Sequence, residues 1–330
     1  MLIKLVRSAP TVYEKGDEKL IVTVTLNPAL DKTVTLPMFH IGHVNRVEKM
    51  RLDPGGKGIN VSKTIQALGG KSIAMGILGG WAGRYIKTCL DKAGITNDFA
   101  YVRQTTRTNL KIIDPELHTN TDVNEPGLPV SSRSINRVFE SMAAKVTAGD
   151  TVVLAGKTPP GVDDRLYGEW AQRLHQKGVR VCLDADGPLL AHGIAAMPEM
   201  IKPNEEEFSR LVGRPLDSIQ DMARAALQLN QRGIGQIVIS MGEKGALFVR
   251  GGRVKIAHGL KVPVKSTVGA GDAAVAALVL SCERGEDWLD TIRLAVAAGT
   301  AAVMCEGTET IALDSVKALL PQVIVEDFIV

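Results

Sequence analysis

A short run near the C-terminal end of the chain combines residues that could hold a phosphate with a carboxylate that could act as a base. It reads STVGAGDAA over residues 266–274 and opens an apolar stretch with helical spacing, about residues 271–282. Gly269 and Gly271 permit a tight turn, and the free amides and positive dipole end of the following helix attract anions. Asp272 would repel a phosphate, so its expected partner is a hydroxyl proton or a metal ion.

An aspartate in the first turn of a helix is also a common cap or dipole partner without any chemistry. A second glycine cluster, DPGGKGINV at residues 53–61, favours the functional interpretation. It opens another helix that runs to about Leu68, before Gly69 and Gly70 end it. Two helix N-termini that could bind anions indicate two phosphorylated ligands.

Composition excludes several classes of protein. The chain has 330 residues with 45% hydrophobic content, enough for one large core. Its formal net charge is only +3 and aromatic residues make up 4%, so neither a basic footprint nor a base-stacking surface for nucleic acid is expected. The most apolar stretch, residues 273–282, is too short to span a bilayer, which argues against a membrane protein.

The cysteines and the first residues indicate a cytoplasmic protein. Cys89, Cys182, Cys282 and Cys305 are widely separated and form no metal-ligand pattern, so mostly buried, reduced thiols are expected. Charged residues stand between positions 14 and 19, where a signal peptide would need an apolar core. Residues 1–20 are therefore expected to be an N-terminal tail, followed by a single domain over 21–330.

The elements that must position these glycine turns alternate in the manner of an α/β protein. Helical patterns cover about 83–93, 134–146, 164–176, 205–212 and 219–231. Between them lie short apolar or β-branched runs at 20–26, 73–78, 151–155, 179–183, 200–202 and 236–240. This order predicts a mostly parallel, doubly wound sheet with helices on both faces.

Two segments do not follow that order. Residues 32–47 and 108–124 alternate polar and apolar side chains with no helix between them. The pattern favours antiparallel strands with one solvated face, and we expect a small lid beside the main sheet.

Rival motifs fail on spacing. Gly70-Lys71-Ser72 has the end of a P-loop, but Ile65 stands where that motif needs its first glycine. Residues 269–274 match a degenerate dinucleotide-binding fingerprint. That fingerprint needs a following strand that ends in an acidic residue, whereas this chain is expected to stay helical through Asp287. The few scattered histidines support neither a hydrolase triad nor a zinc site.

Seven motifs in order, across residues 20 to 320, resemble the ribokinase-like (PfkB) sugar kinases, in the branch with 1-phosphofructokinases and tagatose-6-phosphate kinases. They are TLNPALD at 25–31, VNRV at 44–47, GGKGINV at 55–61, TRTNLK at 106–111, NEPG at 124–127, KPNEEE at 202–207 and VGAGD at 268–272. The resemblance implies a three-layer α/β/α sandwich with a mostly parallel central sheet and a small β-sheet lid. In many relatives the lid also forms a dimer contact, so a homodimer is expected.

On the sugar side, the resemblance implies two groups of ligands. Hydroxyl groups would be held by Asp31, Gly55, Gly56 and Asn60, and the existing phosphate by Lys57, Arg107 and Lys111. Arg107 and Lys111 share one face of a strand by period two. The alternatives are a helix cap for Asn60 and a solvated strand face for the two cations.

On the nucleotide side, the resemblance implies that ATP and Mg²⁺ are bound by Lys202, Asn204, Glu207, Ser240 and Gly242, with Glu207 acting on the metal mainly through water. A capping box alone would also explain Asn204 and Glu207. The small residues 296–299 could contact adenine or pack against another helix.

The implied reaction is in-line transfer of the γ-phosphoryl group of MgATP to a ketohexose phosphate. Asp272 would take the hydroxyl proton, while the amides of Gly269, Ala270 and Gly271 stabilise the moving phosphoryl group. The GGKGIN and RTNLK strings favour fructose 1-phosphate, with tagatose 6-phosphate and fructose 6-phosphate left open. A sensor that kept the fold without catalysis is a further alternative, which the intact aspartate and glycines oppose.

The chain departs from the family pattern at several positions. Lys157 stands in an AGKTPPG run where many relatives have SGSLP, Ala273 replaces a small hydroxyl residue, and DADG at 184–187 replaces a more usual DxSGE. None of these changes removes a group that the chemistry needs, but they bear on which sugar is used.

Overall fold

Ten strands form the central sheet of the computed structural model, which describes residues 19–127 and 129–330. They are β1 (Ile21–Thr25), β4 (Ile73–Gly79), β5 (Thr96–Val102), β8 (Thr151–Ala155), β9 (Arg180–Asp184), β10 (Met200–Ile201), β11 (Gln236–Ser240), β12 (Gly245–Arg250), β13 (Arg253–His258) and β14 (Val325–Asp327). Their order is β14-β13-β12-β11-β10-β9-β8-β1-β4-β5. All neighbours from β11 to β5 are parallel, and β12 to β14 add an antiparallel edge.

The six strands expected from the sequence are all present, whereas β5, β12, β13 and β14 were not expected. The chain leaves β1 toward β4 on one side, and β8 lies on the other side of β1. The order of strands therefore reverses at β1 and β8. In open α/β sheets, ligands bind at the carboxyl ends of strands near such a point.

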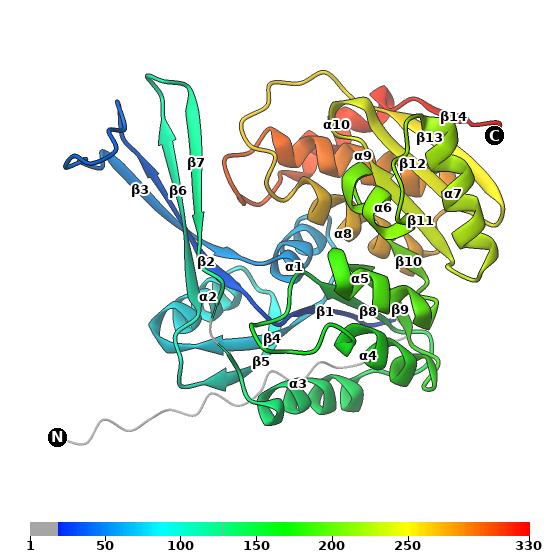
Figure 1. Ribbon diagram of the computed structural model, residues 1–330, viewed down its shortest axis with the longest axis horizontal. Coiled ribbons are helices and arrows are strands. Elements are labelled where there is room, and N and C mark those ends of the chain that lie inside the picture. The colour runs from blue at the N-terminus through cyan, green and yellow to red at the C-terminus, as the bar shows by residue number, and fades with distance from the viewer. Residues whose placement is uncertain (1–18, 128) are drawn as a thin grey trace.

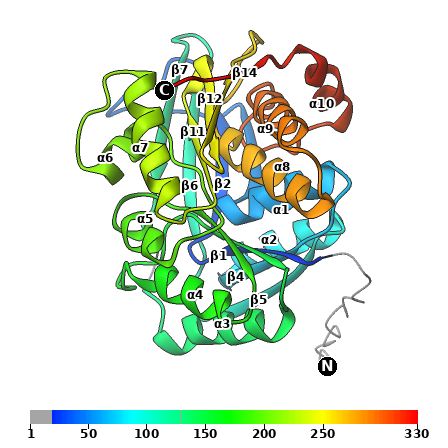
Figure 2. The same ribbon diagram turned by 90° about the vertical axis from the view of Figure 1, so that its right-hand side faces the viewer.

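Helices cover both faces of this sheet, as Figure 2 shows. One face carries α3 (Ser132–Lys145), α4 (Leu166–His175), α5 (Gly187–Gly193), α6 (Glu205–Val212) and α7 (Ile219–Gln231). The other carries α1 (Lys57–Ala67), α2 (Gly80–Lys92), α8 (Ala270–Arg284), α9 (Trp288–Val303) and α10 (Leu313–Leu319). Three short 3-10 helices complete the set at Ile194–Ala196, Gly242–Lys244 and Leu320–Gln322. The three-layer sandwich is confirmed.

The helices expected from the sequence are present, with one correction. The chain does not stay helical through Asp287, because α8 ends at Arg284 and is followed by the C-cap Gly285, whose φ of 66° suits glycine. The Asp287 side chain then accepts hydrogen bonds from the amides of Leu289 and Asp290 and caps α9.

Four strands form the lid, which stands away from the main sheet in Figure 1. They are β2 (Ala29–Thr35), β3 (Lys49–Gly55), β6 (Arg107–Asp114) and β7 (Thr119–Asn124), in the order β3-β2-β6-β7. The prediction of lid strands over 32–47 and 108–124 needs two corrections. The second strand of the first segment lies at 49–55, and β2 pairs with β6 in parallel rather than antiparallel. Alternation of polar and apolar residues reveals a half-solvated strand but not its direction.

The expected tail at 1–20 falls mostly outside the described residues, which begin at Lys19. Leu20 belongs to the core instead, because it is buried and its amide donates to Asp150 Oδ1 over 3.0 Å. The four cysteines are free thiols, although only Cys182 is buried. Among the described residues, no helix is long and apolar enough to cross a membrane.

Candidate active site

Asp272 and Asn60 meet at the N-termini of the two helices that the glycine motifs open. Asn60 lies in the first turn of α1, Asp272 in the first turn of α8, and both are buried. The Asn60 Nδ2 group donates to Asp272 Oδ2 over 2.8 Å. The side-chain oxygen of Asn60 is buried and has no hydrogen-bond partner among the described residues, so it can still accept from a ligand.

Asp184 joins the two sides of the site, and the sequence had shown it only as a departure from a family motif. It ends β9, and its buried Oδ1 lies 3.3 Å from Lys57 Nζ and 3.6 Å from Lys202 Nζ. Burial raises the pKa of Asp184, but the two lysines outweigh burial and hold that pKa below its usual range. Burial lowers the pKa of Lys57, whereas Asp184 and other carboxylates raise it by more, so Lys57 stays charged.

The environment of Asp272 suits a general base. Burial, together with the charge of Asp184, raises its pKa to about 6, while Lys57 and the Asn60 hydrogen bond limit the rise. A carboxylate with that pKa is ionised at neutral pH and more basic than an exposed aspartate.

Glycines shape the N-terminus of α8 as the sequence indicated. Gly269 is the N-cap residue with φ of 84°, a left-handed conformation that favours glycine. A Cβ on Gly271 would lie 2.9 Å from Lys202 Nζ, so the lack of a side chain lets the buried ammonium approach the helix end. The first-turn amides of Ala270 and Gly271 lie beside that cation and could hold an anion with it.

On the lid side, Asp31 and Asn109 lie next to each other in β2 and β6. Asn109 Nδ2 donates to Asp31 Oδ1 over 2.9 Å, while burial raises the pKa of Asp31. A Cβ on Gly55 would lie only 2.0 Å from Asp31 Oδ2, so this carboxylate occupies space that only glycine leaves free.

These groups face a cavity of about 230 Å³ between the lid and the loops before α8 and after α9. Its lining residues are Asp31, Thr33, Asp53, Asn109, Leu110, Lys111, Asp122, Asn124, Val268, Gly307 and Thr308. A cavity of this kind, with several convergent polar groups, is suited to a small polar ligand.

The three cations expected to hold the substrate's phosphate do not lie together. Lys111 lines the cavity and pairs with Asp122 over 3.3 Å. Arg107 lines a different, smaller pocket and donates to the carbonyl oxygens of Glu125 and Asn27 over 2.7 and 3.2 Å. Lys57 lies beside Asp184 instead. Lys157, a departure from the family pattern, is exposed.

The residues expected to bind nucleotide lie at the carboxyl ends of β10 and β11. Asn204 and Glu207 form a reciprocal capping box at α6, in which each backbone amide is bound over 2.8 Å by the other side chain. Ser240 forms a parallel bridge with Asn204, and Gly242 begins the next turn with φ of 60°. Gly299 packs closely against α8, since a Cβ added to it would lie 3.3 Å from the Ala270 carbonyl oxygen. This favours packing against another helix as the role of residues 296–299.

The donor set fits a magnesium ion held mainly by phosphate oxygens and water. Within residues 19–127 and 129–330, no group of three or more metal-ligating side chains occurs. One oxygen of Asp184 is buried without a hydrogen-bond partner among the described residues. The Glu207 carboxylate lies in the first turn of α6, close enough to act on the charge of Lys57, the partner of Asp184. Mg²⁺ keeps several waters and takes few protein ligands at such sites.

The fold and the site together define a carbohydrate kinase. The model of the pfkB family of carbohydrate kinases matches residues 24–315, and the chain belongs to that family. It is therefore a phosphotransferase with an alcohol group as acceptor.

Two curated relatives and one solved structure show which members of the family the chain is similar to. The chain is 37% identical over 278 residues to the 1-phosphofructokinase of Rhodobacter capsulatus, covering 84% of this chain and 88% of the relative. It is 37% identical over 284 residues to the 1-phosphofructokinase of Haemophilus influenzae, covering 86% and 90%. The crystal structure of Escherichia coli phosphofructokinase-2 in complex with substrates and products is similar with a TM-score of 0.88 and 28% identity, covering 92% of this chain and 99% of that one.

Proposed function

We propose that the protein transfers the γ-phosphoryl group of ATP to fructose 1-phosphate and forms fructose 1,6-bisphosphate. The main support for the reaction is the buried Asn60–Asp272 pair, which lies at the N-terminus of α8 where Gly271 approaches Lys202. The choice of sugar is supported by the relatives named 1-phosphofructokinase at 37% identity.

Asp272 acts as the general base in this proposal. It takes the proton of the C6 hydroxyl as the oxygen of that hydroxyl bonds to the γ-phosphorus and the bond from phosphorus to ADP breaks. Asn60 keeps one Asp272 oxygen occupied, so the other faces the hydroxyl. The pKa of about 6 keeps Asp272 ionised before the proton is transferred.

Fixed charges stabilise the transferred group. Lys202 and the first-turn amides of α8 lie where negative charge develops, and Asp184 holds Lys57 and Lys202 in place. Asp184 and Glu207 would hold Mg²⁺, Glu207 mainly through water, and the ion would neutralise part of the phosphate charge. Asn204, Ser240 and Gly242 border the nucleotide at the carboxyl ends of β10 and β11.

The sugar phosphate binds in the cavity under the lid. Asp31 and Asn109, which line it, bind its hydroxyl groups. Asn60 lines a smaller pocket that shares Val268 and Thr308 with this cavity, and its side-chain oxygen and the backbone at Gly55 and Gly56 complete the hydroxyl site in this proposal. Lys111 and Arg107 provide positive charge from β6 for the phosphate already present.

A substrate panel tests the proposal. ADP release would be measured with Mg²⁺ and ATP against fructose 1-phosphate, tagatose 6-phosphate, fructose 6-phosphate, fructose and ribose. We expect kcat/KM for fructose 1-phosphate to exceed that for the unphosphorylated sugars at least about tenfold, since a charge-assisted contact is lost with the phosphate. Faster turnover of tagatose 6-phosphate or fructose 6-phosphate would reassign the substrate, and ATP binding without turnover of any sugar would support a sensor.

The proposal includes a cytoplasmic homodimer that forms through the lid. Met50 on β3 and Val123 on β7 expose 58% and 54% of their surface, more than apolar residues of the sheet core. Sedimentation of the wild type and of a Val123→Lys variant tests this interface. A monomeric wild-type protein would rule it out.

A further inference from the structure

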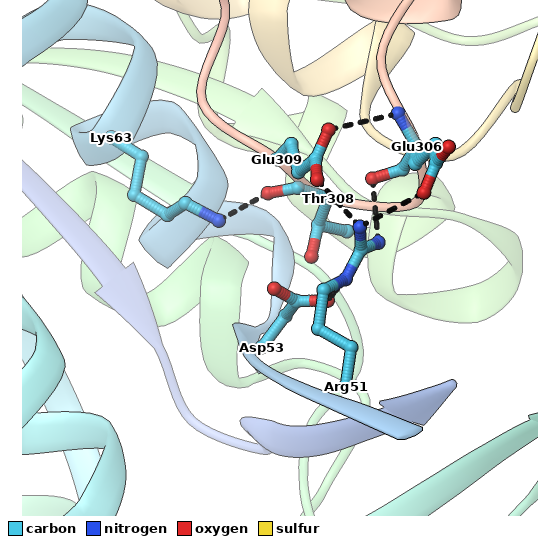
Figure 3. Close-up of polar contacts among 6 residues, drawn as sticks. All are labelled: Arg51, Asp53, Lys63, Glu306, Thr308 and Glu309. Atoms are coloured by element: carbon cyan, nitrogen blue, oxygen red, sulfur yellow. Dashed lines mark hydrogen bonds and ion pairs between the residues drawn. The ribbon is translucent and has the colours of Figure 1, made fainter. Parts of the chain in front are cut away.

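Arg51 connects the lid to the loop between α9 and α10. It lies on β3, and its Nε donates to Asp53 Oδ2 over 2.7 Å on the same strand. Its Nη1 contacts Glu309 Oε1 at 2.6 Å and Glu306 Oε2 at 3.5 Å, and its Nη2 donates to the Glu306 carbonyl oxygen over 2.7 Å. Figure 3 shows this guanidinium between the strand and the loop, with all its nitrogens engaged.

The loop at 306–309 is folded to receive the guanidinium. The Glu309 amide donates to the Glu306 carbonyl oxygen over 3.2 Å, and Glu309 Oε2 accepts from the Glu306 amide over 3.2 Å. Gly307 has φ of 57°, and a Cβ there would lie 2.6 Å from Arg51 Nη2. The positive φ and the close approach of Arg51 both favour glycine at this position.

The same loop forms one wall of the cavity under the lid. Gly307 and Thr308 line it from the loop, and Asp53 lines it from β3. Behind the loop, Lys63 on α1 donates to the Thr308 carbonyl oxygen. The Thr308 hydroxyl is buried and has no hydrogen-bond partner among the described residues, so the loop carries an unsatisfied polar group beside the cavity.

Arg51 also changes the charge of that cavity. Asp31 and Asp53 are direct partners in the pairing of β2 with β3, and both carboxylates line the cavity. The charge of Asp53 contributes to the raised pKa of Asp31, after burial. A sugar phosphate is an anion, so two unneutralised carboxylates would oppose its binding. Burial lowers the pKa of Lys63, and the charges of Asp53, Asp31 and Asp272 act against that shift. Arg51 is the cation that contacts Asp53 directly, with its Nε 2.7 Å from Asp53 Oδ2.

We propose that Arg51 is a positioning residue for the sugar phosphate, an inference that rests on the proposed function. Arg51 binds both Asp53 and the loop at 306–309, so it holds two walls of the cavity at their present spacing. It also neutralises one carboxylate of the cavity. Single exposed ion pairs contribute little to stability, but here one guanidinium joins four oxygens from two segments that are 255 residues apart. Arg51 does not reach the reacting groups, so it acts on binding and not on phosphoryl transfer.

The test compares Arg51→Met with Lys49→Met, which removes an exposed cation from the same strand. For Arg51→Met we expect KM for the sugar phosphate to rise about tenfold, with kcat and KM for ATP within about twofold of the wild type. Lys49→Met leaves all three constants unchanged. Equal losses in kcat and kcat/KM for Arg51→Met would instead indicate a role in the transition state and overturn the proposal.

Hydrogen exchange on the ligand-free enzyme tests the positioning role without activity. Backbone amides in 49–55 and 304–312 are expected to exchange faster in Arg51→Met than in Lys49→Met, while those in the core of α8 are unchanged. Unchanged exchange in both segments would overturn the proposal. This measurement remains decisive even if the wild type phosphorylates no sugar phosphate, which would refute the proposed function instead.

A charge exchange completes the test. Arg51→Glu places like charges against Glu306 and Glu309, and Arg51→Glu combined with Glu309→Arg restores opposite charges across the same gap. We expect KM of the double variant to be at least about threefold lower than that of Arg51→Glu alone, because contacting residues couple. Additive effects of the two substitutions would contradict a direct contact.

Discussion

The amide of Asn60 and the carboxylate of Asp272 are joined by a 2.8 Å hydrogen bond although 212 residues separate them in sequence. The bond fixes which oxygen of the aspartate is free and stabilises its ionised form. Because α1 carries Asn60 and α8 carries Asp272, the bond also joins α1 to α8, the helix whose N-terminus we propose holds the transferred phosphoryl group.

The first prediction concerns the pH dependence of the wild-type enzyme. Asp272 acts as a base only when it is deprotonated, and its pKa is about 6. We therefore expect kcat to be constant above about pH 7 and to fall about tenfold per pH unit well below 6. A rate profile between pH 4.5 and 8.5 checks this, and a flat profile through pH 6 would remove Asp272 from the proton transfer.

Two substitutions should move this profile in opposite directions. Asn60→Ala removes a hydrogen bond that lowers the pKa of Asp272, so the acidic limb should move to higher pH. Asp184→Asn removes a negative charge that raises the pKa of Asp272, so the limb should move to lower pH. Shifts in the same direction would show that the electrostatic account of Asp272 is wrong.

Asp184→Asn should also reduce stability. Lys202 is only 6% exposed and would lose the carboxylate that neutralises it together with Lys57. Breaking a buried pair in this way typically costs about 3–5 kcal/mol. Urea denaturation at pH 7.5 measures the loss, with Asp164→Asn on the surface as the control. A loss below about 1 kcal/mol would mean that water or rearrangement already compensates the lysines.

Lys111 and Arg107 should differ in their effect on the substrate. Lys111 lines the larger cavity, whereas Arg107 holds the backbone of Glu125 and Asn27. We expect Lys111→Met to raise KM for the sugar phosphate by about tenfold or more, and Arg107→Met to raise it by a smaller factor. Steady-state kinetics with saturating ATP compare them. A larger effect of Arg107→Met would place the phosphate near the smaller pocket.

Gly55→Ala tests how closely the backbone lies against Asp31. The added Cβ would be 2.0 Å from Asp31 Oδ2, so the carboxylate must turn away from its position beside Asn109. We expect weaker binding of the sugar phosphate, with the KM for ATP unchanged, and isothermal titration with each ligand separates the two. Unchanged sugar-phosphate affinity would show that Asp31 does not bind the substrate.

The sequence predicted the elements of the fold where local signals are strong. The helices at 205–212 and 219–231 have the predicted bounds, since Asn204 and Ser218 cap their first turns. The lid strand at 49–55 was missed because Asp53-Pro54-Gly55 has the composition of a turn. Proline is tolerated there because β3 is an edge strand of the lid sheet.

Sequence motifs pointed to many of the residues of the candidate site, but not to the contacts that these residues make with one another. Family motifs pointed to Asp272, Asn60 and Lys202, but the link that Asp184 forms between Lys57 and Lys202 depends on three distant segments meeting at one sheet edge. Arg51 and Lys63 carried no motif at all. Lys63 follows Asn60 by three residues and so shares its helix face, a signal that could have identified it.

The turnover of Asp272→Asn tests the central claim most directly. The variant keeps the shape of the side chain and can still contact Asn60, but it cannot take a proton. With the sugar phosphate that the wild type prefers, we predict that kcat falls by about 10²–10⁴ while KM changes little, and that Asp164→Asn retains normal activity. Turnover of Asp272→Asn within a few fold of the wild type would contradict the assignment of Asp272 as the catalytic base.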